Sequence, residues 1–122
     1  ASEPEGSILH LFAISLLSAL DGDYQRGIKA TRKWEDANLV DGEGWYYVAG
    51  LYCRNMEIGK GISVLDKAVE KGYFAYSHML KCPFLDPARG NPAFDTILEK
   101  ARLKHEAFKK KFFSDKLSRR KL

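Results

Sequence analysis

The segment Trp45-Tyr46-Tyr47-Val48-Ala49-Gly50-Leu51-Tyr52 decides the fold of this 122-residue chain. Its main apolar positions, Trp45, Val48, Ala49 and Tyr52, are spaced so that they share one face of an α-helix. A polar turn follows, and then a second run of apolar residues with helical spacing, at Ile58, Ile62, Leu65 and Val69. The region therefore predicts a pair of amphipathic helices, with Gly72 ending the second one.

This helix pair recurs when the sequence is shifted by 34 residues. The turn Asp21-Gly22-Asp23 then falls on Asn55-Met56-Glu57, and no gap is needed. A glycine inside a helix costs about 1 kcal/mol relative to alanine, so we expect the recurrent glycines to let the paired helices cross closely. The matched pairs are Leu11 with Trp45, Ile14 with Val48, Leu17 with Leu51, Arg26 with Lys60, Gly27 with Gly61, Ile28 with Ile62, Lys33 with Lys67, and Asp36 with Glu70.

The rest of the chain is expected to be helical too, within one domain covering residues 1–122. The apolar content of 45% is enough for a core. The patterns predict helices near residues 7–20, 24–36, 43–54, 57–71 and 92–113, a short helix at 76–81, and no strand. Three prolines, Pro83, Pro87 and Pro92, predict a loop before the last helix, with Asn91 as its cap.

The repeat resembles the tetratricopeptide repeat, a 34-residue helix pair with the pattern W-x2-L-G-x2-Y, A-x3-F and P. The second copy reads Trp45-x2-Val48-Ala49-x2-Tyr52, then Gly61-x3-Leu65, with Tyr73 where proline would stand. The first copy is looser. The resemblance implies an all-α fragment of an α-solenoid, with repeat 1 at about 8–41, repeat 2 at about 42–75, and a degenerate cap at 76–122 that ends in a long capping helix.

The segment from Phe84 to Phe94 looks like the closing segment of repeat arrays in large bacterial signalling and regulatory proteins. The family resemblance implies a non-catalytic scaffold or regulatory module. Such a module binds a peptide or helix of another protein in its concave groove, or associates with itself. The positions that line this groove in the family correspond here to Phe12, Leu16, Ala19, Tyr46, Gly50, Cys53 and Arg54.

Catalytic and metal-binding patterns are absent from the sequence. No nucleophile and base have a recognisable spacing, and Gly59-Lys60-Gly61-Ile62-Ser63 lacks the spacing of a phosphate-binding loop. His78 and Cys82 lie four residues apart and could offer two metal ligands, but no second pair accompanies them. We therefore expect no enzymatic activity, no cofactor and no metal.

The charge distribution leaves a second function open. The net charge is +4, yet residues 100–122 hold ten Lys and Arg against two acids. This basic helix is either a solvated cap of the repeat array or a surface for nucleic acid or another acidic partner. The basic residues of that alternative are Lys104, Lys109, Lys110, Lys111, Arg119 and Arg120.

The first helix predicts an association surface. Its residues from Ile8 to Leu20 are apolar nearly all round, which indicates a helix covered on both sides. We expect a homo-oligomer or a neighbouring repeat to cover it. The same stretch is too short to span a bilayer, and the two cysteines, Cys53 and Cys82, do not form a disulfide framework. The expected location is the cytoplasm, with no membrane partner.

Overall fold

The structure, a computed structural model, describes residues 7–37 and 41–120, and within them it contains helices and no strand. The all-α prediction is confirmed. The elements are α1 (Ile8–Asp21), α2 (Tyr24–Glu35), α3 (Gly42–Arg54), α4 (Ile58–Glu70), α5 (Tyr76–Lys81), the 3-10 helix η1 (Pro83–Ala88) and α6 (Pro92–Arg120).

Two expectations about the C-terminal part were wrong. The proline-rich segment forms the 3-10 helix η1 instead of a loop, since Pro83 occupies the start of a helix, where its missing N–H is not needed. Helix α6 continues to Arg120 instead of ending near residue 113. No glycine or proline occurs after Pro92, so nothing in the sequence breaks that helix.

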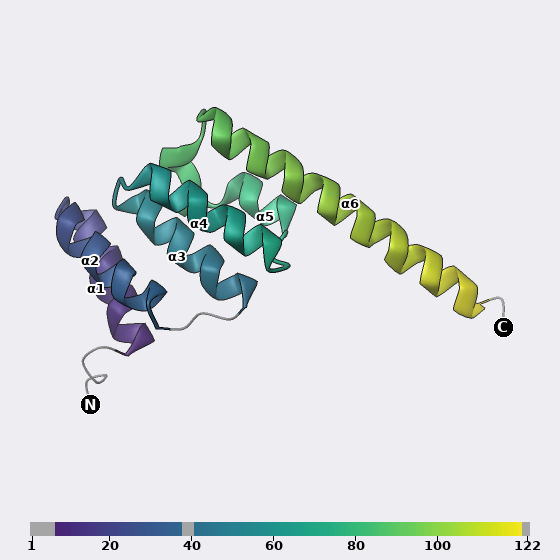
Figure 1. Cartoon of the computed structure of the whole chain (residues 1–122), viewed down its shortest axis with the longest axis horizontal. Coiled ribbons are helices and arrows are strands. Elements are labelled where there is room, and N and C mark those ends of the chain that lie inside the picture. Colours follow the sequence, from purple (N-terminus) through teal and green to yellow (C-terminus); the bar gives the residue numbers. More distant parts are fainter. Residues whose placement is uncertain (1–6, 38–40, 121–122) are drawn as a thin grey trace.

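The 34-residue period is visible in the helix bounds. Helices α1 and α3 begin at Ile8 and Gly42, and helices α2 and α4 begin at Tyr24 and Ile58, so both pairs of starting points have the predicted offset. The first helix of each pair is capped by a side chain. The Ser7 hydroxyl accepts from the N–H of His10, and the Asp41 carboxylate accepts from the N–H of Gly44. The two helix pairs lie side by side (Figure 1).

The core is centred on α3, which packs against α2, α4 and η1. The proximal part of α6 packs against α4 and α5 and covers this core. Its residues Phe94, Ile97 and Ala101 are buried, and Lys100 forms ion pairs with Asp66 and Glu70 of α4. Beyond this contact α6 extends away from the body of the molecule (Figure 1). None of the described helices combines the length with the hydropathy that crossing a bilayer demands.

The recurrent glycines have different neighbours. A Cβ on Gly61 would lie 2.5 Å from the Cys53 sulfur of the paired helix α3, which confirms the close crossing predicted there. A Cβ on Gly27 would instead overlap the side-chain amide of Asn55, at the end of α3. Gly27 therefore makes room for Asn55, a residue of the next helix pair.

Candidate functional site

The seven predicted groove residues separate into two groups. Phe12, Leu16 and Ala19 of α1 are half-buried and reachable from solvent. Tyr46, Gly50 and Cys53 of α3 are buried, with 3% of Tyr46 and 1% of Cys53 exposed. These three α3 residues are therefore not accessible to a partner in this structure, and their assignment to a binding groove stays a prediction. The seventh residue, Arg54, is half-buried at the end of α3.

The chain itself fills the α3 half of the groove. The Phe84 side chain of η1 packs on Gly50, where a Cβ would lie 3.0 Å from the Phe84 Cβ. The hydroxyl of Tyr46 forms a 2.9 Å hydrogen bond with Nδ1 of His78, and its ring lies 4.5 Å from the ring of Tyr73. Burial is the main cause that raises the pKa of Tyr46 far above its usual range. The segment that follows α4 thus covers these residues of α3.

Cys53 belongs to the interior of the helix pair. Its sulfur faces Gly61 of α4, and burial raises the pKa of its thiol to about 12, with a smaller contribution from Cys82. A thiol with this pKa is protonated and unreactive at neutral pH. Its role is packing.

The α1 half of the groove has no such cover. A shallow hollow of about 420 Å³ is bordered by Ile8, Leu9, Phe12, Trp34 and Tyr47. The rings of Phe12 and Trp34 are nearly perpendicular, with centroids 6.0 Å apart. Such an arrangement of rings favours an apolar or aromatic side chain from a partner. Apart from Phe12, the residues of this hollow were not among the predicted groove positions.

The orientation of α1 explains why so much apolar surface remains exposed. Its buried face carries Leu11, Ser15 and Ser18. Ser15 faces inward because its hydroxyl lies 2.6 Å from that of Thr31 and accepts from the Asn55 amide. Four of the apolar side chains of α1 consequently point outward, with exposed fractions of 53% for Ile8, 59% for Leu9, 60% for Leu17 and 64% for Leu20.

These residues form one continuous surface, which we call the N-terminal apolar face. No charged residue occurs between Ile8 and Leu20, so nothing polar interrupts it along α1 apart from His10 and the serines. The expectation that a second surface covers α1 on both sides stays a prediction, because the described chain covers one side only. The face consists of Ile8, Leu9, Phe12, Leu16, Leu17, Leu20 and Tyr47, and the largely buried Trp34 lines its hollow.

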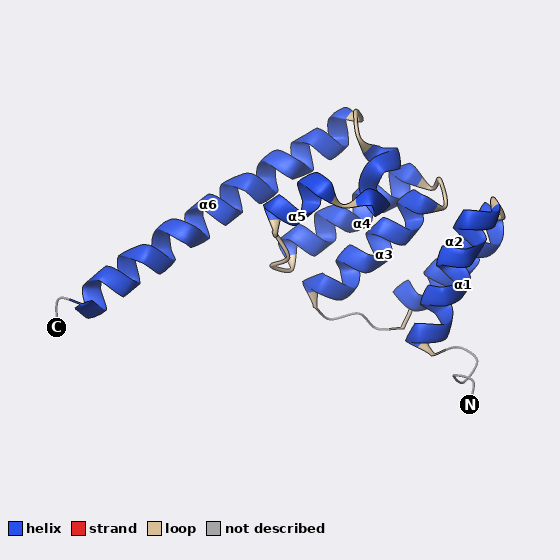
Figure 2. Cartoon of the chain, turned by 180° about the vertical axis from the view of Figure 1, so that it is seen from behind, coloured by secondary structure: helices blue, strands red, loops and turns tan. Residues whose placement is uncertain are grey.

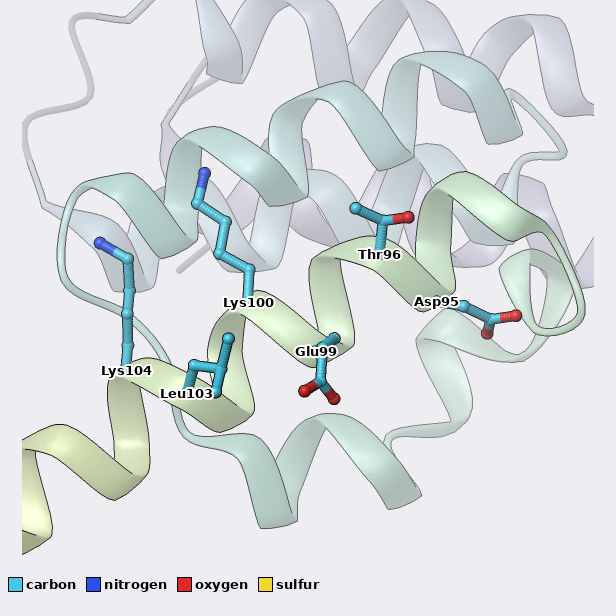
Figure 3. Close-up of a pocket in the computed structure, with 6 residues that line it drawn as sticks. All are labelled: Asp95, Thr96, Glu99, Lys100, Leu103 and Lys104. Carbon is cyan, nitrogen blue, oxygen red and sulfur yellow. The ribbon is translucent and has the colours of Figure 1, made fainter.

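A larger hollow, of about 600 Å³, lies along α6 and does not have the features of a chemical site. All six residues that line it belong to α6, and Figure 3 shows their side chains spreading in different directions. Lys100 points toward α4, where its acidic partners lie, and Glu99 pairs with Arg102 at 2.5 Å. The polar groups therefore do not converge on a common point.

The basic residues of α6 are distributed around the helix. Lys109, Lys110 and Lys111 are exposed, and as consecutive residues they point in three directions about 100° apart. Lys104 is half-buried, and the side chains of Arg119 and Arg120 lie outside the described residues. Phe108 and Phe113 are exposed between the lysines.

His78, one of the two possible metal ligands named with Cys82, forms a hydrogen bond within the chain. Nδ1 of His78 contacts the Tyr46 hydroxyl, and residues 7–37 and 41–120 contain no group of three or more potential metal ligands.

Comparison of the chain with protein-family models, curated proteins and solved structures finds no match.

Proposed function

We propose that this chain is a tetratricopeptide-like, non-catalytic module that binds protein through the N-terminal apolar face. The observation that carries this proposal is the exposure of Ile8, Leu9, Leu17 and Leu20 beside the Phe12–Trp34 hollow. Contiguous exposed apolar surface of this kind marks protein interaction sites. Complete burial of one exposed leucine contributes about 1.5–3 kcal/mol before the cost of association is subtracted, so micromolar binding requires that several of these residues be buried together.

The covered half of the groove supports the same conclusion. At Gly50 an aromatic ring, Phe84, is presented by a short helix of the same chain, and we infer that the N-terminal apolar face accepts side chains of the same kind. The free thiols of Cys53 and Cys82 are compatible with a reducing compartment such as the cytoplasm. The partner that we propose is an amphipathic helix with apolar side chains three and four positions apart.

Selection from a displayed peptide library tests this proposal. We expect the selected peptides to carry apolar residues at helical spacing and to bind the folded chain. Leu9→Asp should abolish their binding, because it places a charge in the middle of the face. Gln25→Asp introduces the same charge on the exposed side of α2 and should leave binding unchanged. Selected peptides that bind both variants equally would show that the N-terminal apolar face is not the binding site.

Nucleic-acid binding by the basic helix is the second candidate. Its support is the excess of Lys and Arg in residues 100–122. The arrangement of the lysines around α6 favours it less, since a surface that follows a phosphate backbone concentrates its cations on one side. The two candidates differ in salt dependence. Phosphate contacts release counterions and weaken steeply with salt, whereas binding on an apolar face does not.

A further inference from the structure

A second hollow, of about 230 Å³, lies between α1 and α2, and we call it the α1–α2 hollow. Leu11 and Ile14 line it from α1, and Ala30 lines it from α2. Ile14 is a helical neighbour of Leu17, which belongs to the N-terminal apolar face and is 60% exposed. The hollow therefore adjoins that face. Both helices lie side by side at the end of the molecule farthest from the C-terminal end of α6 (Figure 2).

The α2 side of this hollow is basic. Arg26, Lys29 and Lys33 line it, and we call these three residues the α2 basic row. Their spacing of three and four residues places them on one face of α2, where the row extends over about 10 Å of helix. All three residues are exposed. Among the described residues, their side chains form no ion pair and no hydrogen bond.

The acids near α2 do not neutralise this row. Glu35, the only acid within α2, pairs with Lys60 of α4. Asp21 and Asp23 lie at the turn before α2 and Asp36 follows its end, so these three exposed acids lie beyond the ends of the row. Helix α1 carries no charged residue before Asp21. The α1–α2 hollow is therefore apolar on its α1 side and basic on its α2 side.

An amphipathic helix with acidic residues along one edge fits this arrangement. Acidic residues three and four positions apart repeat the spacing of the α2 basic row, so each can face one cation. An apolar side chain beside them can fill the hollow against Leu11 and Ile14. A nucleic acid fits less well, because its phosphates would also face the apolar residues of α1 and lose water there without a compensating cation.

A second copy of this chain does not offer such an acidic edge. Asp66 and Glu70 of α4 are both paired with Lys100, and Glu99 of α6 is paired with Arg102. None of the helices that the structure describes presents three unpaired acids at helical spacing. The helix that complements the α2 basic row therefore belongs to another protein.

We propose that the partner of this module is an acidic amphipathic helix, which places an apolar side chain in the α1–α2 hollow and acidic side chains against the α2 basic row. The apolar contacts supply most of the affinity. The row determines which helices the N-terminal apolar face accepts and accelerates their association. This inference rests on the proposed function, because it names the charge of the partner that binds the adjoining face.

Parallel peptide selections on two forms of the full chain test this inference. One form is the original chain, and the other carries Arg26→Gln, Lys29→Gln and Lys33→Gln, which remove the charges and keep extended polar side chains. Peptides selected on the original chain should carry Asp or Glu along one edge of their apolar stripe, and those selected on the triple variant should not. An acidic peptide selected on the original chain should bind the triple variant roughly tenfold more weakly, since each exposed ion pair contributes up to about fivefold.

A matched control removes three cations elsewhere on the molecule. Lys71→Gln, Lys81→Gln and Lys109→Gln change exposed residues and alter the net charge equally, so they should leave the affinity for the acidic peptide unchanged. Replacing the acids of the peptide by Gln should weaken its binding to the original chain but not to the triple variant. Salt should weaken binding of the acidic peptide more than binding of its Gln form. Circular dichroism should show the same helix content for all three proteins.

Two outcomes would overturn the inference and leave the proposed function standing. If the original chain and the triple variant select equally acidic peptides, the α2 basic row does not contact the partner. If the selected peptides lack an acidic edge while single-stranded DNA binds the original chain and not the triple variant, the row receives nucleic acid. Selected peptides that still bind the Leu9→Asp variant, in contrast, would contradict the proposed function itself.

Discussion

Gly27 of α2 lies directly against the side-chain amide of Asn55, which closes the end of α3. The amide nitrogen of Asn55 donates to the backbone oxygen of Ser15 at 3.2 Å and to its hydroxyl at 3.1 Å. That hydroxyl lies 2.6 Å from the hydroxyl of Thr31, which in turn donates to the backbone oxygen of Gly27. A buried polar network therefore joins the two helix pairs at one point, and a glycine is required to fit it.

Gly27→Ala should destabilise the protein, although alanine is the better helix former. The new methyl group would overlap the Asn55 amide, and overpacking of this kind costs about 1–3 kcal/mol. In an Asn55→Ala background the same substitution should be neutral or stabilising by up to about 1 kcal/mol, because the overlap is gone and helix propensity remains. Urea unfolding of the four proteins measures this cycle. If Gly27→Ala changes the free energy of unfolding equally in both backgrounds, Gly27 does not contact the Asn55 side chain.

The glycines of α4 offer a second paired test. Gly61→Leu should lower the free energy of unfolding by about 1–3 kcal/mol, since Cys53 and the backbone of Ala49 leave no space for a side chain. Gly59→Ala, two residues earlier in the same helix, has no neighbour within 4 Å and should stabilise by up to about 1 kcal/mol. Equal thermal midpoints for the two variants would show that Gly61 is not at a crossing.

The helices could be predicted from the sequence because local patterns determine them. The 34-residue period, the apolar spacing and the turns at Asp21 and Asn55 gave helix bounds close to those observed. The exception is the end of α6, which depends on the absence of any breaker over a long, strongly charged stretch and not on a positive signal.

The groove could be predicted only in part, because its state depends on contacts distant in sequence. Nothing near Gly50 indicates that Phe84 will cover it, and nothing in α1 indicates that Ser15 will be buried in preference to Leu17. The serine is buried because Thr31 and Asn55 are available to bond it. A polar network of this kind reverses the orientation that hydrophobicity alone would favour for α1.

The two thiols should differ in reactivity. Cys53 is 1% exposed and burial raises its pKa to about 12, so a thiol reagent at pH 8 should not modify it in the folded protein. Cys82 is half-buried and should react first. Mass spectrometry of the chain treated with iodoacetamide should show one modified cysteine in the folded protein and two after unfolding in guanidinium. Modification of Cys53 in a folded Cys82→Ser variant would contradict its placement against Gly61.

Alkaline pH should destabilise the fold through Tyr52. Its hydroxyl donates a 2.6 Å hydrogen bond to Glu35, and burial, followed by this bond, raises the pKa of Tyr52 well above its usual range. An unfolded tyrosine loses its proton near pH 10, whereas folded Tyr52 keeps it. Above about pH 10 the unfolded state therefore binds fewer protons than the folded state, and stability falls as pH rises.

Tyr52→Phe tests the origin of this effect. The variant should be less stable at pH 8 by about 1–3 kcal/mol, since the partly buried carboxylate of Glu35 loses the hydrogen bond that the Tyr52 hydroxyl donates. Its urea midpoint should then fall less steeply than that of the original chain between pH 9.5 and about 11, because the proton difference at this position is gone. Tyr24→Phe removes an exposed hydroxyl and should leave both the midpoint and its slope unchanged. If Tyr52→Phe keeps the original slope, the alkaline loss of stability arises elsewhere in the chain.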